Sequence, residues 1–223
     1  MSLAVYHTWK GLAPADRGAA VAFGNFDGVH LGHRSVIALA AHAARELGAP
    51  LGVISLEPHP LTLFQPGGPP FRLTNPHQMA RQVELLGVDR LYLLPFGQQM
   101  ANLSDHDFVR QILVGGLGVR HMAVGFDVTY GFGRTGGPDP LRRDAAEFGF
   151  TVSVAEEVAA DGLKISSTAI REDIRQGHPD RAALVGGRAW PSRYRVSGPT
   201  LGRRVRHDKR FTESAHSGSH RRV

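Results

Sequence analysis

Short apolar runs alternate with longer amphipathic stretches along this chain, and this alternation restricts its fold more than any other feature. Residues 20–23 (AVAF) are typical of a buried strand and end at a glycine-containing loop. Residues 31–47 (LGHRSVIALAAHAAREL) repeat apolar residues at helical spacing and stop before Gly48, a residue type common just after a helix. A second apolar run follows at residues 51–56. This order predicts an α/β fold with a parallel sheet and helices on both faces.

The alternation continues along the chain. Residues 58–70 are rich in proline and are expected to form a surface loop, of a length that often has a function. Asn75 is a suitable cap for a helix with Pro76 in its first turn, and Ser104 is a suitable cap for another. Further elements are expected at residues 90–94 (strand), 120–124 (strand) and about 140–154 (a helix followed by a strand).

The composition is that of a globular chain and excludes several functional classes. The 223 residues are 42% hydrophobic and 21% charged, which suffices for a packed core. Cysteine is absent, so disulfide scaffolds, thiolate metal sites and cysteine nucleophiles are excluded. No apolar run approaches the roughly 18 residues of a membrane-spanning helix, and the chain start lacks the pattern of a signal peptide. We therefore expect a soluble, cytoplasmic protein with no membrane partner.

The net charge of +6 is unevenly distributed. Residues 1–187 carry 16 Lys and Arg against 18 Asp and Glu, a net of −2, whereas residues 188–223 carry 10 against 2, a net of +8. The second segment also contains few apolar residues, a composition typical of disorder. We expect one domain over residues 1–187, with no specific nucleic-acid partner, and a disordered basic tail over residues 188–223.

The loop after the first strand lacks two familiar phosphate-binding motifs. None of the three lysines follows a glycine, so there is no P-loop, and no GxGxxG motif follows the strand. Residues 24–33 instead read GNFDGVHLGH, with His30 and His33 three positions apart at a helix start. Such residues share a helical face, and the free N–H groups and dipole of a helix start favour an anion. The loop therefore predicts a polyphosphate site, although the pair alone could also be a solvated helix face or half of a zinc site.

Four motifs in order give the chain a resemblance to a known family. FDGVHLGH contains the HxGH signature of nucleotidylyltransferases, and GNFDGVHLGHR resembles the adenylyltransferase module of bacterial FAD synthetases, which are bifunctional riboflavin kinase/FMN adenylyltransferases. LEPHP at residues 56–60, VGFDVTYGFGR at 124–134 and ISSTAIR at 165–171 are similar to FEPHP, VGxDFxFGxGR and ISSTxIR of that family. The chain departs from the family at Val128, where Phe is usual, and more mildly at Leu56 and Ala169. The resemblance implies a Rossmann-like nucleotidylyltransferase fold.

The resemblance implies an ATP site built from the first loop and the ISSTAIR segment. The implied catalytic residues, which would hold the β- and γ-phosphates, are His30, His33, Lys164 and Arg171. The implied ATP-binding residues are Gly24, Asn25, Phe26, Asp27, His30, Gly32, His33, Ser166, Ser167, Thr168 and Arg171. Asp27 is expected to orient the nucleotide or to lie on the side of a metal ion. Taken alone, the three hydroxyl residues could serve only as a helix cap, and a cap and a phosphate site are compatible.

The resemblance also implies a flavin site. The implied FMN-binding residues are Pro58, His59, Pro60, Asp127, Tyr130 and Phe132. Aromatic faces suit a planar ring, and glycines in the second segment permit a close backbone approach. Taken alone, the first segment could be a turn with an exposed histidine, and the second a glycine-rich turn with core aromatic residues.

The implied reaction is FMN + ATP giving FAD + pyrophosphate, with Mg²⁺ as cofactor and ATP and FMN as substrates. Two other readings stay open. One is an adenylyl- or cytidylyltransferase acting on another phosphate acceptor, such as nicotinamide mononucleotide, phosphopantetheine or a phospho-alcohol. The other is a binder of anions or nucleic acid that uses the basic tail.

The PTAN-type motif of the family's riboflavin kinase domain is absent. We therefore expect residues 188–223 to be a remnant of the start of that domain, without kinase activity.

Overall fold

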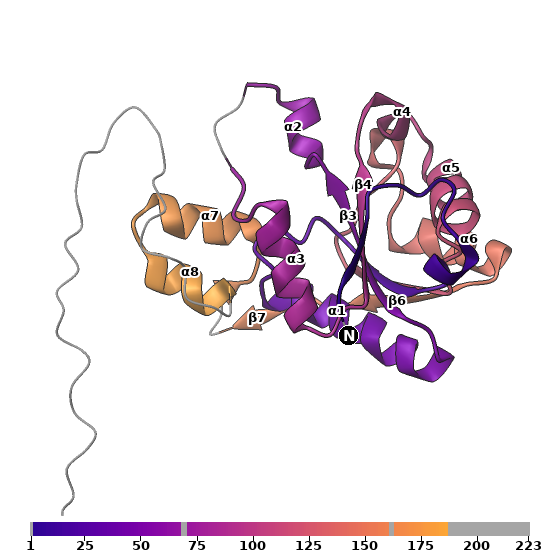
Figure 1. Cartoon of the computed structure of the whole chain (residues 1–223). Coiled ribbons are helices and arrows are strands. Elements are labelled where there is room, and N and C mark those ends of the chain that lie inside the picture. The colour runs from indigo at the N-terminus through magenta and orange to yellow at the C-terminus, as the bar shows by residue number, and fades with distance from the viewer. Residues whose placement is uncertain (1, 68–70, 161–162, 187–223) are drawn as a thin grey trace, which may run out of the picture.

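A six-stranded parallel sheet forms the centre of the molecule (Figure 1). The computed structural model describes residues 2–67, 71–160 and 163–186, so the basic tail lies outside the described residues. In spatial order the strands are β1 (Ala4–Tyr6), β4 (Arg90–Pro95), β3 (Leu51–Glu57), β2 (Ala20–Phe23), β5 (His121–Gly125) and β6 (Thr151–Ala155). Every neighbouring pair in this sheet is parallel. The predicted α/β class is confirmed.

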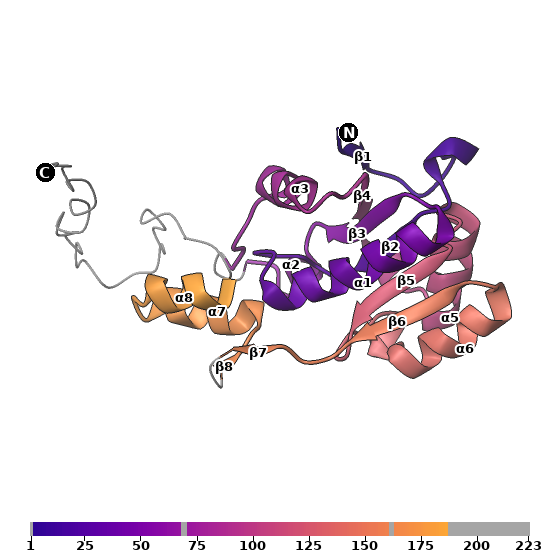
Figure 2. The same cartoon turned by 90° about the horizontal axis from the view of Figure 1, so that it is seen from below.

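Helices cover both faces of the sheet, as expected (Figure 2). On one face lie α1 (Leu31–Leu47) and α3 (Pro76–Leu85); on the other lie α5 (Asp105–Phe108), the π-helix η2 (Val109–Gly116) and α6 (Pro138–Phe148). Because side chains alternate along a strand, each strand supplies both cores. Ala22 and Val53, for example, pack toward α1, whereas Phe23 and Ile54 pack toward α5.

The helix ends follow from local sequence. Helix α1 has the predicted bounds and ends at Gly48, which takes the left-handed conformation of a C-terminal cap. Asn75 and Gln78 form a reciprocal capping box at the start of α3, with Pro76 in the first turn. At the start of α5, the Ser104 side chain accepts a hydrogen bond from the Asp107 backbone N–H.

Several elements go beyond the sequence prediction. The proline-rich segment contains a short helix, α2 (Pro60–Phe64), because Pro60 suits a first helical turn and His59 caps it. Strand β1 is too short to show a periodic pattern, and it is held by the stacking of Tyr6 on Tyr92 at 5.3 Å. The remaining additional elements are η1 (Pro14–Asp16), α4 (Gln98–Ala101), η3 (Phe132–Arg134), and the β7 (Ala159–Ala160) and β8 (Leu163–Lys164) hairpin.

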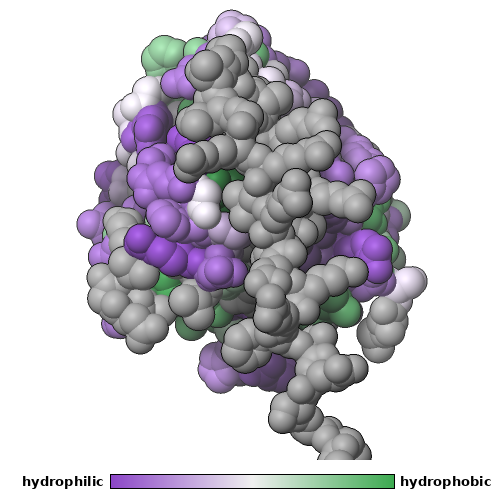
Figure 3. Space-filling model, turned by 90° about the vertical axis from the view of Figure 1, so that its left-hand side faces the viewer, coloured by the Kyte–Doolittle hydropathy of each residue, from purple (hydrophilic) through white to green (hydrophobic). Residues whose placement is uncertain are grey.

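Two C-terminal helices, α7 (Ser167–Arg175) and α8 (Pro179–Gly186), form a small subdomain beside the sheet (Figure 1). Their apolar side chains, among them Ile170 and Ala182, cluster with Leu73 and Ile165 in a third, smaller core. On the side of the molecule that carries these helices, the described residues in view are mostly hydrophilic (Figure 3). In the described part of the chain, no helix is both long and apolar enough to cross a membrane.

The strand order places a ligand-binding edge at the centre of the sheet. The chain runs from central β2 outward to β3 and β4, and then returns to β5 on the other side of β2. In open parallel sheets, ligands bind beyond the carboxyl ends of the strands where the winding direction reverses. Here that point lies beyond β2 and β5.

Candidate active site

One cavity of about 940 Å³ opens at this edge of the sheet. It is lined by the segments that follow the five strands β2, β3, β4, β5 and β6 and by the start of α7. The structure brings most of the predicted site residues together here: Gly24, Asn25, Phe26, Asp27, His30, Gly32, His33, His59, Pro60, Asp127, Tyr130, Phe132, Ser166, Ser167, Thr168 and Arg171. Pro58 is exposed and does not line the cavity. Lys164 belongs to β8, and its side chain lies outside what the structure describes.

The two histidines form a stacked pair at the start of α1. Their ring centroids are 3.7 Å apart and the rings are inclined by 18°. The His33 backbone N–H donates a 3.3 Å hydrogen bond to His30 Nδ1. Nδ1 is therefore an acceptor, which places the proton of the neutral His30 ring on Nε2. A Cβ atom on Gly32 would lie 3.2 Å from the His30 ring, so the glycine leaves room for this arrangement.

Both histidines are neutral in the free protein. Burial lowers the pKa of His30 to about 4, with Asp27 opposing and Arg171 reinforcing the shift. Burial, followed by the neighbouring His30 and Arg171, holds the pKa of His33 well below its usual range. The pair therefore offers N–H donors to an anion without adding positive charge to the site.

The loop that presents His30 has a strained backbone. Phe26 and Val29 have φ angles of 46° and 41°, in the left-handed region that a β-branched residue rarely adopts. Both side chains are buried, and the Val29 backbone N–H donates to the Phe26 carbonyl at 3.3 Å. Packing thus holds a conformation that costs free energy locally, a situation common at functional sites.

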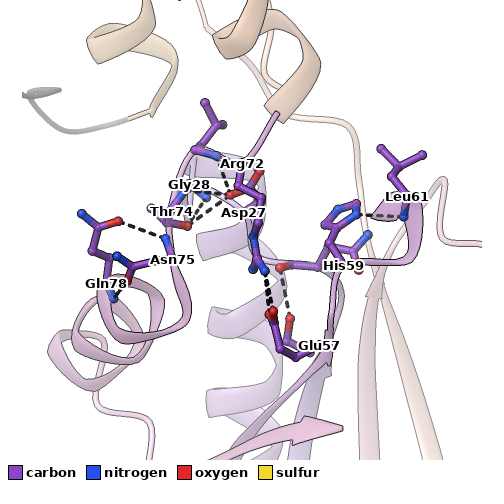
Figure 4. A network of polar contacts seen from close by, with 12 residues as sticks. Asp27, Gly28, Glu57, His59, Leu61, Arg72, Thr74, Asn75 and Gln78 are labelled. Atoms are coloured by element: carbon purple, nitrogen blue, oxygen red, sulfur yellow. Dashed lines mark hydrogen bonds and ion pairs between the residues drawn. The ribbon is translucent and has the colours of Figure 1, made fainter. Parts of the chain in front are cut away.

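Asp27 anchors this loop to two distant segments, and Figure 4 shows its contact with Thr74 in one of them. Its carboxylate accepts hydrogen bonds from the backbone N–H groups of Leu73 and Thr74, each at 2.9 Å, and from the Thr74 hydroxyl at 3.2 Å. It also forms a 2.7 Å ion pair with Arg171, and its side chain is 1% exposed. Both carboxylate oxygens are therefore already in use. This arrangement fits an anchor better than the metal-side role considered from the sequence.

The start of α7 is fastened to the same loop. The Ser167 hydroxyl donates to the Asp27 carbonyl at 2.8 Å, and the Ser166 hydroxyl accepts from the Ala169 backbone N–H at 3.1 Å as the helix cap. Arg171 also donates through Nε to the Phe71 carbonyl at 2.7 Å. The predicted cap is confirmed, and in the free protein the charge of Arg171 is balanced by Asp27.

The LEPHP segment brings His59 to the other side of the cavity. His59 is buried, its Nδ1 accepts from the Leu61 backbone N–H at 3.2 Å, and its ring edge contacts Phe71 with centroids 4.9 Å apart. Burial lowers the pKa of His59, so this ring is also neutral near pH 7. Beside it, Arg72 pairs with Glu57 at 2.7 Å (Figure 4).

The aromatic residues of the VGFDVTYGFGR segment have different surroundings. Tyr130 is only 6% exposed and packs against Phe23 and Phe108, with ring centroids 6.4 and 5.4 Å away. A Cβ atom on Gly136 would lie 2.6 Å from the Tyr130 ring, so this glycine serves the packing of the tyrosine. Phe132 is 64% exposed at the cavity wall. The sequence predicted the same flavin-binding role for both rings, whereas in the structure the Phe132 ring is far more accessible than that of Tyr130.

Sequence reasoning missed other apolar residues on this side of the cavity. Phe64 on α2 and Phe126 after β5 are exposed and line it, and Phe96 packs edge-on against Phe64 with centroids 5.9 Å apart. The signal available in the sequence was a phenylalanine at position 64, within a proline-rich segment that was expected to lie on the surface. The cavity therefore has a polar end at the histidine pair and an aromatic end between α2 and the segment after β5.

Comparisons with known protein sequences indicate one family. The model of the FAD synthetase family matches residues 12–169. The bifunctional riboflavin kinase/FMN adenylyltransferase of Pseudomonas fluorescens is 40% identical over 193 residues, covering 85% of this chain and 60% of that protein. The Escherichia coli (strain K12) protein of the same name is 33% identical over 189 residues, covering 84% of this chain and 60% of that protein.

A solved structure resembles this chain as well. The crystal structure of a macrolide-efflux protein from Streptococcus pneumoniae superposes with a TM-score of 0.74 at 27% identity, covering 84% of this chain and 60% of that chain. The chain thus spans about 60% of the length of the curated relatives it matches.

Proposed function

Because this chain belongs to the FAD synthetase family, we propose that it transfers the adenylyl group of ATP to FMN, giving FAD and pyrophosphate. One observation carries the proposal. A single cavity joins an anion site, formed by the histidine pair and the start of α7, to an aromatic end that suits a flavin ring. Adenylyl transfer to FMN requires a triphosphate and a flavin in one cavity.

In this proposal the protein aligns the reactants and stabilises charge. A phosphate oxygen of FMN attacks the α-phosphorus of ATP, a new P–O bond forms, and the bond to the bridging oxygen of the β-phosphate breaks. The FMN phosphate is already anionic near pH 7, so no general base is needed. Catalysis then depends on holding the two phosphates in line and on stabilising the departing pyrophosphate.

The neutral histidines supply donors for this stabilisation. The Nε2–H of His30 and a ring N–H of His33 would donate to the β- and γ-phosphate oxygens, together with backbone N–H groups at the start of α7. Negative charge brought next to the rings favours their protonated form. Binding of the triphosphate is therefore expected to raise the pKa of both histidines above the low values of the free site.

Arg171 and Asp27 hold the two halves of the phosphate site in register. Their ion pair connects α7 to the loop that presents His30, so the start of α7 and the histidine pair face one volume. Asp27 is thus a positioning residue in this proposal. Arg171 lines the cavity, and its positive charge acts to lower the pKa of both histidines.

The described residues do not form a protein site for Mg²⁺ at the histidine pair. Asp27 is the buried carboxylate closest in sequence to that pair, and its oxygens already accept hydrogen bonds. In this proposal Mg²⁺ is part of the substrate MgATP, in which the phosphates bind it. The proposal is limited to adenylyl transfer and does not include riboflavin phosphorylation.

A panel of acceptors tests the proposal. Purified protein is incubated with MgATP and, separately, with FMN, riboflavin or nicotinamide mononucleotide, and the products are separated by chromatography. We expect FAD from FMN and no product from the other two. A dinucleotide formed from nicotinamide mononucleotide but not from FMN would indicate a transferase with another acceptor. Binding of nucleotides or nucleic acid without any product would indicate a binding protein.

A further inference from the structure

A second group of potential ligands lies outside the cavity, between α5 and α6. His106 Nδ1 is 3.1 Å from Asp144 Oδ1, and His106 Nε2 is 3.9 Å from Glu147 Oε1. One potential ligand atom from each of these three residues lies within 4.8 Å of the other two. None of the three lines the cavity, and the proposed adenylyl transfer uses none of them.

Buried polar atoms at this position lack partners. Asp144 is 7% exposed, and its Oδ2 has no hydrogen-bond partner among the described residues. The hydroxyl of Tyr130, a residue that is 6% exposed, likewise lacks one within the described part of the chain. The charge of Asp144 is close enough to contribute to the raised pKa of Tyr130. An unpartnered carboxylate oxygen in a buried position is costly, and a bound ion or water is a common explanation.

We propose that His106, Asp144 and Glu147 bind a divalent transition-metal ion of the zinc class. One imidazole nitrogen and two carboxylate oxygens are a ligand set that such ions accept, with water completing the shell, whereas Mg²⁺ and Ca²⁺ prefer oxygen ligands alone. Adjacent ligands of a tetrahedral Zn²⁺ are about 3.3 Å apart when the bonds are roughly 2 Å long. The 3.1 Å between His106 Nδ1 and Asp144 Oδ1 is close to this. Because a histidine gives one nitrogen to an ion, the exposed side chain of Glu147 would have to move from its present place beside Nε2, within a group whose ligand atoms already lie within 4.8 Å of one another.

The electrostatic surroundings favour a cation. The negative charges of Asp144, Glu147 and Asp107 all act on His106. The positive charge of Arg143 acts in the opposite sense, because it acts to lower the pKa of the neighbouring Tyr130. Metal binding would replace the proton that the imidazole and the Asp144 carboxylate share in the metal-free protein.

An ion at this position would restrain α5 against α6 and so affect the segment that carries Phe132. That segment rests on the start of α5. The Phe132 backbone N–H bonds to the Leu103 carbonyl at 2.6 Å, and the Thr135 hydroxyl contacts Asp105 at 3.2 Å. Gly131 has φ of 74°, and a Cβ atom there would lie 2.5 Å from the Asp105 backbone nitrogen. Metal binding itself does not depend on the proposed adenylyl transfer.

The test uses the full chain with Co²⁺ as a spectroscopic probe and Zn²⁺ in calorimetric titrations, in the absence of ATP and FMN. The chain contains 12 histidines, and others of them could bind the ion. The test therefore compares the number of bound ions and the binding affinity between variants. His106→Ala is expected to bind one equivalent fewer than the unsubstituted protein. Glu147→Gln is expected to bind that equivalent at least tenfold more weakly. Because Glu147 is exposed, Glu147→Gln is expected to fold normally and keeps the test valid if His106→Ala folds poorly.

His42→Ala is the matched control. His42 is exposed and pairs with Glu46 at 3.3 Å on α1, but no buried carboxylate joins that pair among the described residues. The His42→Ala variant should bind the same number of Zn²⁺ ions as the unsubstituted protein. Zn²⁺ should also raise the melting temperature of the unsubstituted protein and of His42→Ala, and not that of His106→Ala. Equal stoichiometry and affinity in the unsubstituted protein, His106→Ala and Glu147→Gln would overturn the proposal.

Discussion

Arg171 and Asp27, separated by 144 residues in sequence, form a 2.7 Å ion pair that ties the start of α7 to the loop carrying the histidine pair. Asp27 is almost fully buried and accepts further hydrogen bonds from Leu73 and Thr74. This pair therefore links both parts of the proposed phosphate site to the rest of the fold.

Substituting Asp27 by Asn should destabilise the protein strongly. The change leaves the Arg171 guanidinium without its charged partner in a mostly buried position, and breaking a buried pair in this way typically costs about 3–5 kcal/mol. The measurement is urea unfolding at pH 7.5. Asp139→Asn is the control, because Asp139 pairs with Arg142 at the same distance of 2.7 Å but is 91% exposed. Its loss should cost about 0–1 kcal/mol. Equal losses of unfolding free energy for the two substitutions would contradict a stabilising role of the buried pair.

Substituting His33 by Ala should lower the rate of FAD formation by at least an order of magnitude. Loss of one preorganised donor in a site of this kind typically costs roughly 2–4 kcal/mol of transition-state stabilisation. Steady-state kinetics with MgATP and FMN measure the effect, and His42→Ala on the exposed side of the same helix is the control. A His33→Ala protein that folds normally and turns over at the full rate would show that His33 is not part of the site.

The low pKa of His30 predicts how stability depends on pH. An ordinary histidine pKa is 6.5, whereas that of His30 in the folded protein is about 4. Between these values the unfolded chain binds a proton that the folded protein does not, so the free energy of unfolding falls as the pH decreases from about 6.5 to 4. At pH 5 the His30 contribution to this loss is about 2 kcal/mol.

His30→Asn tests this pH dependence, because asparagine retains a side-chain acceptor for the cap of α1. Its unfolding free energy should change less between pH 7.5 and pH 5 than that of the unsubstituted protein. The raised pKa of His106 acts in the opposite direction but is common to both proteins. Identical losses of stability on acidification would contradict the buried, neutral state of His30.

Phe132 and Tyr130 should respond differently to substitution by Ala. Tyr130 is part of the core, so its loss should cost about 3–5 kcal/mol of stability. Phe132 is exposed, so its loss should change stability by less than about 0.5 kcal/mol. It should raise the KM for FMN several-fold and leave the KM for ATP unchanged. An unchanged KM for FMN would place the flavin ring elsewhere in the cavity.

The sequence predicted the features of this protein that are encoded locally. The bounds of α1 followed from the periodicity of residues 31–47 and from Gly48, and the capping of α3 followed from Asn75 and Pro76. The residues of the proposed phosphate site stand within contiguous motifs, and most of the residues that the sequence singled out line one cavity.

Features that depend on tertiary contacts could not be predicted in this way. The pairing of Asp27 with Arg171 joins residues far apart in the chain. Tyr130 and Phe132 are both aromatic and stand two positions apart, and only the packing of Phe23, Phe108 and Gly136 around Tyr130 distinguishes them. The neutral state of the histidines depends on burial, which the motif itself does not reveal.

The most direct test of adenylyl transfer follows the α-phosphate of ATP. Purified protein is incubated with FMN and MgATP labelled either at the α- or at the γ-phosphate, and the flavins and pyrophosphate are separated. We expect the α-label in FAD, the γ-label only in pyrophosphate, and slower appearance of both with His33→Ala. Consumption of ATP without α-label in any flavin would contradict the proposed transfer.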